Sequence, residues 1–403
     1  MKRILFGLAL GSLSLASCSS DDDNINPTPE LNVPSTYTFE RNSNSTVSYS
    51  GQTLRLRMTS ELLSSFNDFD NQTQESLSNM FSNENNPFSE ADLNETSKSV
   101  KSKVAASQLY FSTNTVESNE LKADFESYID QQMGEVKANR NELAAAGQAG
   151  QIADGSKTRY VNAKGLELDQ AFAKGLIGAL LADQMLNNYL SSAVLDEGDN
   201  VENNNNNVTE EGASYTTMEH KWDEAYGYLY GDPSIPAEDP NSVLNESDDH
   251  LLFNYLGEVD ADSDFAGIAE ETFEAFKKGR AAIEAGDYEL RDEQANIIRE
   301  NISKVIAVRA VHYLAEGAAS LEEGNNMGST FHELSEGYGF VYSLRFTHNP
   351  ETGAPYLSAE TVKSFREQMM NENGFWSVSP ETLEGIAQEI AAEFGFSVEM
   401  AAE

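Results

Sequence analysis

The sequence predicts a mainly α fold, a duplicated helical bundle of two pseudo-symmetric repeats with a small N-terminal β-hairpin. Two observations support this prediction. Most of the chain after residue 60 spaces its apolar residues at helical intervals. In addition, the motif "HKWDEAYGYLY" at 220–230 returns as "HELSEGYGFVY" at 332–342. A spacing of 112 residues matches one helical bundle, so it favours a duplicated bundle over a solenoid of short units.

Residues 1–18 have the pattern of a lipoprotein signal peptide. "MKRILFGLALGSLSLASC" has a basic start and an apolar stretch well short of the ~20 residues that a bilayer needs. Leu15-Ala16-Ser17-Cys18 resembles a bacterial lipobox, which predicts a lipidated Cys18; the alternative is an ordinary signal with a chance cysteine. The acidic "SSDDDN" that follows resembles the surface-export tag of Bacteroidota lipoproteins. We therefore expect an outer-membrane, surface-exposed lipoprotein, with periplasmic display as the alternative.

Composition excludes several function classes. Cys18 is the only cysteine, so its lipidation would leave no thiol for a disulfide, a metal site or a nucleophile. The net charge of −41 repels phosphates, which makes nucleic acid a poor partner.

The elements then follow in order. Residues 19–35 have the composition of a disordered tether, and 36–403 are predicted to form one helical domain. "TYTFERNSNSTVSYSGQ" predicts the hairpin, and the apolar segment 165–195 predicts a buried helix because charged residues such as Lys174 interrupt it. We place repeat 1 at about 95–231, repeat 2 at about 264–345 and C-terminal helices at 359–395.

The two motifs place matching residues on one helical face. Positions 220, 224, 227 and 228 (His220, Glu224, Gly227) fall within one arc, as do positions 332, 336, 339 and 340 (His332, Glu336, Gly339). The other aromatic and aliphatic residues of each motif, at 222, 226, 229 and 230 and at 334, 338, 341 and 342, lie on nearly the opposite side. We therefore expect each motif helix to be buried on two sides, with its glycine at a close backbone approach. We also expect the two helices to meet across a pseudo-twofold, with both His/Glu pairs near the junction.

These motifs, the duplication and the lipoprotein start resemble the imelysin group of bacterial surface and periplasmic proteins. More closely, the chain is similar to an imelysin-like lipoprotein family of Bacteroidota, whose opening "VPSTYTFERNSNSTVSYSGQTLRLRM" fits, and the resemblance covers about residues 33–395. It implies a binding lipoprotein in iron or haem acquisition beside an outer-membrane receptor. It also carries a disputed peptidase label, so a metal-dependent hydrolase is the rival. A purely structural surface component is a third possibility.

The imelysin motif Gly-x-His-x-x-Glu maps onto this chain only in part. His220 takes the place of the histidine and Asp223 that of the carboxylate, but Met218 replaces the glycine, and Ser335 stands where the second repeat should have its acid. The candidate ligands of a first-row metal ion, Fe or Zn, are His220, Asp223, Glu224, His332 and Glu336. The alternative is an imidazole–carboxylate hydrogen bond that fixes the seam between repeats.

Other chemistry-bearing patterns are weaker. The zincin pattern His-Glu-x-x-His, a nucleophile elbow and a phosphate loop do not occur in the sequence. Asp260, Asp262, Asp264 and Glu271 have EF-hand spacing, but Phe265 stands where that loop needs glycine, which favours an acidic helix start. No role is assigned to His250, His312 or His348.

Overall fold

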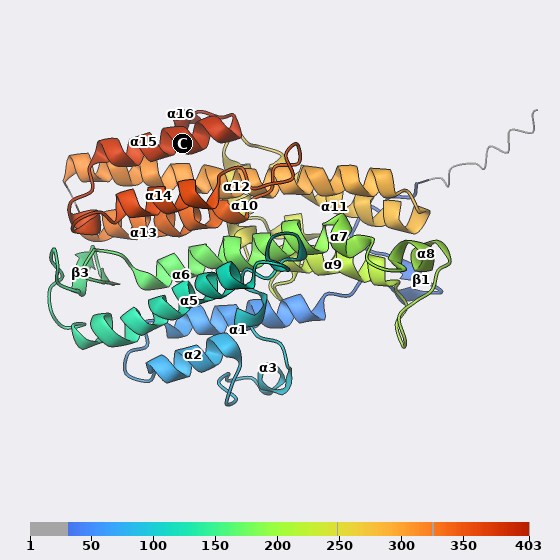
Figure 1. Cartoon of the computed structure of the whole chain (residues 1–403), viewed down its shortest axis with the longest axis horizontal. Coiled ribbons are helices and arrows are strands. Elements are labelled where there is room, and N and C mark those ends of the chain that lie inside the picture. Colours follow the sequence, from blue (N-terminus) through green and yellow to red (C-terminus); the bar gives the residue numbers. More distant parts are fainter. Residues whose placement is uncertain (1–30, 248, 325, 403) are drawn as a thin grey trace, which may run out of the picture.

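The computed structural model describes residues 31–402 except 248 and 325, and this part of the chain is mainly helical, as predicted. Figure 1 shows an elongated molecule whose longer helices run roughly along its long axis. The helices of the first half are α1 (Ser50–Ser65), α2 (Gln74–Ser82), α3 (Ala91–Glu95), α4 (Gln108–Phe111), α5 (Thr115–Gln131), α6 (Leu168–Leu176), α7 (Ser192–Leu195), α8 (Asn200–Asn205) and α9 (Thr217–Tyr230). Those of the second half are α10 (Leu252–Ala261), α11 (Ile268–Ala285), α12 (Tyr288–Glu323), α13 (Met327–Ser343), α14 (Ala359–Met369), α15 (Pro380–Phe394) and α16 (Val398–Ala401).

Two small antiparallel hairpins lie at opposite ends of the molecule (Figure 1). β1 (Glu40–Arg41) and β2 (Asn44–Ser45) confirm the predicted hairpin, whose turn residues Asn42 and Ser43 both have positive φ. β3 (Gly150–Asp154) and β4 (Lys157–Val161) form a second hairpin that we did not predict. Its turn contains Gly155 at φ 57°, so the Asp154-Gly155 pair was a hairpin signal in the sequence.

The second half is built around α12, a helix of 36 residues that packs on α11, α13 and α15. The two halves join where α6 of the first half packs on α13. The apolar segment after α6 is not one regular helix: it widens into π-helical turns at Ile177–Ala182 and Met185–Tyr189 before α7. No helix in the described part of the chain has the length and apolarity needed to cross a membrane.

The motif helices α9 and α13 are buried on two sides, as predicted. Each residue from His220 to Leu229 has the same degree of burial, buried or half-buried, as the corresponding residue from His332 to Val341. Both glycines lie at close approaches. A Cβ on Gly227 would come within 2.5 Å of the Tyr49 Cβ, and a Cβ on Gly339 within 2.5 Å of the Lys174 Cβ.

The two motif helices do not meet as expected. The face of α9 that carries His220 and Glu224 packs on α1, whereas the corresponding face of α13 packs on α6. In Figure 1, α9 and α13 lie in opposite halves of the long axis. Each motif is therefore completed by a helix from earlier in the chain, and the order α1, α6, α9, α13 interleaves the two packed pairs.

Candidate functional site

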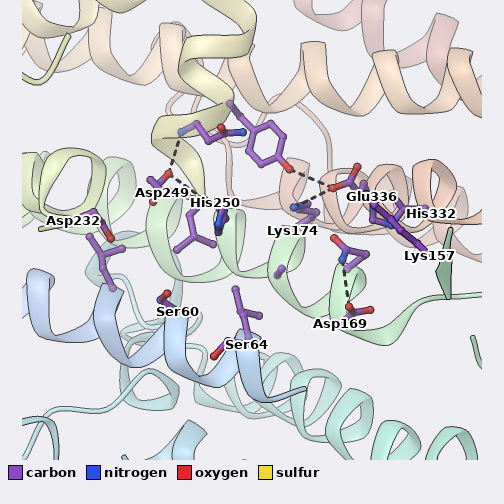
Figure 2. Close-up of a pocket in the computed structure, with 17 residues that line it drawn as sticks. Ser60, Ser64, Lys157, Asp169, Lys174, Asp232, Asp249, His250, His332 and Glu336 are labelled. Carbon is purple, nitrogen blue, oxygen red and sulfur yellow. Dashed lines mark hydrogen bonds and ion pairs between the residues drawn. The ribbon is translucent and has the colours of Figure 1, made fainter. Parts of the chain in front are cut away.

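A cavity of about 710 Å³ lies where α1, β4, α6, α10 and α13 come together. We call this space, lined by α1, β4, α6, residues 232 and 249–255, and α13, the repeat cavity. Figure 2 shows its polar side chains projecting from these elements. The polar residues labelled there are Ser60, Ser64, Lys157, Asp169, Lys174, Asp232, Asp249, His250, His332 and Glu336.

The centre of the cavity wall is an ion pair between α6 and α13. Lys174 Nζ lies 3.1 Å from Glu336 Oε1, and the two side chains are only 8% and 12% exposed. Tyr255 on α10 donates a 3.4 Å hydrogen bond to the same oxygen, and the Lys174 ammonium lies 5.0 Å from the centre of the Tyr255 ring. Burial alone would raise the pKa of Glu336, but Lys174 lowers it below its ordinary value. The pair is thus ionised and faces a cavity.

A serine of α13 positions Lys174. The Ser343 hydroxyl donates to the Lys174 carbonyl at 2.6 Å and accepts from the Gly178 N–H at 2.9 Å. In a regular α-helix these two backbone groups would bond to each other. The inserted hydroxyl satisfies both where the helix widens into its first π-turn, and it ties the end of α13 to the residue that bears the ammonium.

His332 is held by a buried carboxylate. Its Nδ1 lies 3.0 Å from Oε2 of Glu167. Glu167 directly precedes α6, and its side chain is 3% exposed. Burial raises the pKa of Glu167 to about 7. Burial would lower the pKa of His332, but the hydrogen bond and charge of Glu167 raise it above its ordinary value. The contact with Glu167 fixes the His332 ring through Nδ1, and no hydrogen bond to its Nε2 is formed by the described residues.

The first motif uses the same positions for cross-links. His220 Nδ1 lies 3.0 Å from the Ser48 carbonyl oxygen, and its ring stacks on Tyr215 at 4.6 Å. Glu224 accepts from Gln52 at 3.1 Å and from Lys221 at 2.9 Å. Burial alone would raise the pKa of Glu224, but Lys221 lowers it. Neither Glu224 nor His220 lines the repeat cavity.

Asp223 is fully buried, and donors occupy both of its oxygens. The Tyr37 hydroxyl donates to Oδ1 at 2.7 Å, the Ser48 N–H donates to Oδ2 at 3.0 Å, and Arg280 Nε lies 3.3 Å from Oδ1. These contacts join the N-terminal segment, α9 and α11, so Asp223 acts as a packing group here.

The five candidate metal ligands are not brought to one place. His332 and Glu336 share the repeat cavity, whereas His220, Asp223 and Glu224 lie at the α1–α9 contact. Within neither motif does the histidine hydrogen-bond to its glutamate; each reaches a different element. Among the residues that the structure describes, no three His, Cys, Asp or Glu side chains are arranged to hold one metal ion. The metal site stays a prediction.

Sequence reasoning missed several residues of the cavity. Lys174 was seen only as an interruption of an apolar helix, and a charge in such a helix was itself a signal of a special environment. His250 was given no role but lines the cavity beside Asp249. Glu167 and Tyr255 carried no signal, because only folding brings them to α13. The EF-hand pattern is an acidic helix start, since Asp260 accepts the N–H groups of Gly267 and Ala269 at the beginning of α11.

Comparison with known proteins gives one relationship. No curated protein and no solved structure matches the chain. One family model, described as a domain of unknown function (DUF4856), matches residues 34–397, which is nearly all of the predicted helical domain. The likeness to imelysins remains a prediction. The chain belongs to the DUF4856 family.

Proposed function

We propose that the protein is a surface-anchored binding lipoprotein whose ligand occupies the repeat cavity. The observation that carries this proposal is the Lys174–Glu336 pair, which is ionised and faces a space of about 710 Å³. Small-molecule sites typically have volumes of about 300–1,000 Å³ and a few convergent polar groups. Both halves of the chain supply the wall, so a ligand here would bridge them.

The likeness to imelysins supports a role in the acquisition of iron or haem beside an outer-membrane receptor. His332 fits such a role, because a histidine whose Nδ1 is bonded to a carboxylate is the usual form of a metal-binding imidazole. Glu336 follows one turn later on the same face and is the second candidate donor, which would exchange its bond to Lys174 for the metal ion. Fe(III), Zn(II) and haemin are therefore the first ligands to test.

The test compares two serine variants on exposed helix surfaces. Ser60→Trp would fill the repeat cavity from α1, whereas Ser364→Trp adds the same bulk on α14, away from it. Protein purified without chelators would be analysed by native mass spectrometry and titrated with Fe(III), Zn(II) and haemin. We expect a ligand that stabilises the unaltered protein and the Ser364→Trp variant but not Ser60→Trp. Equal binding by both variants would contradict the proposal, and metal-dependent peptide hydrolysis lost in Ser60→Trp would favour the hydrolase.

A further inference from the structure

The charges of the repeat cavity are separated. Lys157 and Lys174 lie at the end of the cavity formed by β4, α6 and α13, together with Glu336 (Figure 2). Asp232 and Asp249 lie toward the other end, beside His250 and away from both lysines (Figure 2). Among the described lining residues, one end thus holds two lysines together with Glu336 and Asp169, and the other end holds two aspartates and no lysine or arginine.

Asp249 is a buried carboxylate with one oxygen left over. The residue is 5% exposed, and its Oδ2 accepts the N–H groups of Leu251 and Asn254 at 3.0 Å each, at the beginning of α10. Its Oδ1 accepts no hydrogen bond from the described residues. Burial raises the pKa of Asp249, the two N–H groups lower it, Asp232 raises it and His250 lowers it, and the net pKa is about 6. The carboxylate is therefore held in the wall of the cavity through Oδ2.

Asp232 is half-buried and also forms hydrogen bonds through one carboxylate oxygen. Its Oδ1 accepts from the Ser234 N–H at 2.8 Å and from the Ser234 hydroxyl at 2.6 Å. Its Oδ2 has no hydrogen-bond donor in the part of the chain that the structure describes. The two aspartates therefore each offer one carboxylate oxygen to the same cavity, and each is fixed in orientation through the other oxygen.

We propose that the end of the repeat cavity lined by Asp232 and Asp249 binds the positively charged amino group of an organic ligand. This rests on the proposed function, that the cavity holds a ligand. An ammonium group has three donors and suits two carboxylate acceptors, whereas a first-row metal ion takes four or more ligands. Leu56, Leu63, Ala173 and Leu251 give the remaining space an apolar wall for the body of the ligand.

The experiment uses three probes of one length and different charge: pentylamine, pentanol and pentanoate. Binding to the full chain would be measured by isothermal titration calorimetry at neutral pH and fixed ionic strength. We expect pentylamine to bind and the other two to bind much more weakly. Asp249→Asn keeps an acceptor for the N–H groups of α10 but removes the charge, and we expect it to weaken pentylamine binding roughly tenfold to hundredfold. It should leave the melting temperature of the empty protein unchanged or higher.

Asp260→Asn is the matched control. Asp260 also accepts two backbone N–H groups at a helix start, but it lies outside the repeat cavity. Its loss therefore reports the general effect of one charge on a protein of net charge −41. We expect it to change pentylamine binding less than twofold.

The outcomes separate this inference from the proposed function. Equal pentylamine binding by Asp249→Asn and the unaltered protein would overturn the inference. A preference for pentanoate over pentylamine would also overturn it, and so would an Asp249→Asn variant that loses metal binding but keeps amine binding. If Asp249→Asn does not fold, Asp232→Asn serves the same comparison. Failure of the proposed function has a different signature: no probe, metal ion or haemin would then distinguish Ser60→Trp from Ser364→Trp.

Discussion

Corresponding side chains of the two motifs occupy the same positions in their helices but have different hydrogen-bond partners. The Ser48 N–H donates to Asp223, and the Glu167 N–H donates to the Ser335 hydroxyl at 2.9 Å. In both motifs, then, the residue three positions after the histidine accepts a hydrogen bond from a backbone N–H group. That group belongs to the segment that leads into the partner helix. The first motif adds a buried arginine to its carboxylate, and the second keeps only a hydroxyl. The missing acid in the second repeat is therefore a change of packing partner, and the acceptor function is retained.

The Lys174–Glu336 pair gives a prediction about stability. Lys174→Met should destabilise the fold by roughly 3 kcal/mol, because it leaves Glu336 buried without its cation. The double variant Lys174→Met with Glu336→Gln should recover most of that loss, because a neutral amide needs no counter-charge. Urea denaturation of the single and double variants measures both values.

Lys221→Met is the control for this cycle. Lys221 bonds to Glu224 in the first motif, but its side chain is 28% exposed, so its loss should cost less than about 1 kcal/mol. If the losses of stability caused by Lys174→Met and Glu336→Gln simply add in their double variant, Lys174 and Glu336 are not coupled.

The helices show where sequence patterns suffice. The sequence places repeat 2 at about 264–345 and the C-terminal helices at 359–395, and α11 to α15 occupy nearly these spans. Periodicity and end signals fix such helices because each one buries a continuous stripe. The close approaches of Gly227 and Gly339 followed from the same periodicity. The π-turns after α6 could not be predicted, because they depend on Ser343 from a helix 165 residues later.

The cavity was beyond the same reasoning for a related cause. His332 and Glu336 were candidate residues because a motif marked them. Asp249, Glu167 and Tyr255 come near them only because α6 packs on α13 and α10 packs on α11 and α12. The expectation that the two motif helices meet was wrong because a face with a glycine shows only that a backbone comes close. It does not say which element comes close, and here the nearest atoms belong to Tyr49 and Gln52 at the start of α1 and to residues of α6.

A pair of glycine variants tests the helix contacts. Gly339→Ala should destabilise the fold by about 1–3 kcal/mol, since the new methyl group would overlap Lys174 and the backbone of α6. Gly385→Ala in α15 meets nothing within 4 Å and should stabilise by up to about 1 kcal/mol, because alanine is the better helix former. Thermal unfolding of both variants, compared at their midpoints, gives the two signs. A neutral Gly339→Ala would mean that α6 and α13 are not in close contact.

At the scale of the whole molecule, the sequence predicts that a lipid on Cys18 anchors the protein to a membrane. The lipobox and Cys18 lie outside the described residues, so the predicted anchor is tested in cells. Cys18→Ala should release the protein from membranes, because no lipid can then be attached, whereas Ser19→Ala beside it should leave the protein membrane-bound. Fractionation with a high-salt wash measures this. Retention of the Cys18→Ala protein in washed membranes would show that the lipobox interpretation is wrong.

The interleaving of α1, α6, α9 and α13 has a consequence for how the two copies of the motif could diverge. Two subunits that exchange a helix form a symmetric dimer, in which every substitution appears twice. Joining the copies in one chain removes that constraint. Here one copy forms cross-links, with Gln52 of α1 donating to Glu224 and the Ser48 N–H donating to Asp223. The other has kept an ionised pair at an open space. A homodimer could not hold one such space and one such seam at once, so the asymmetry of this molecule is available only to a fused pair.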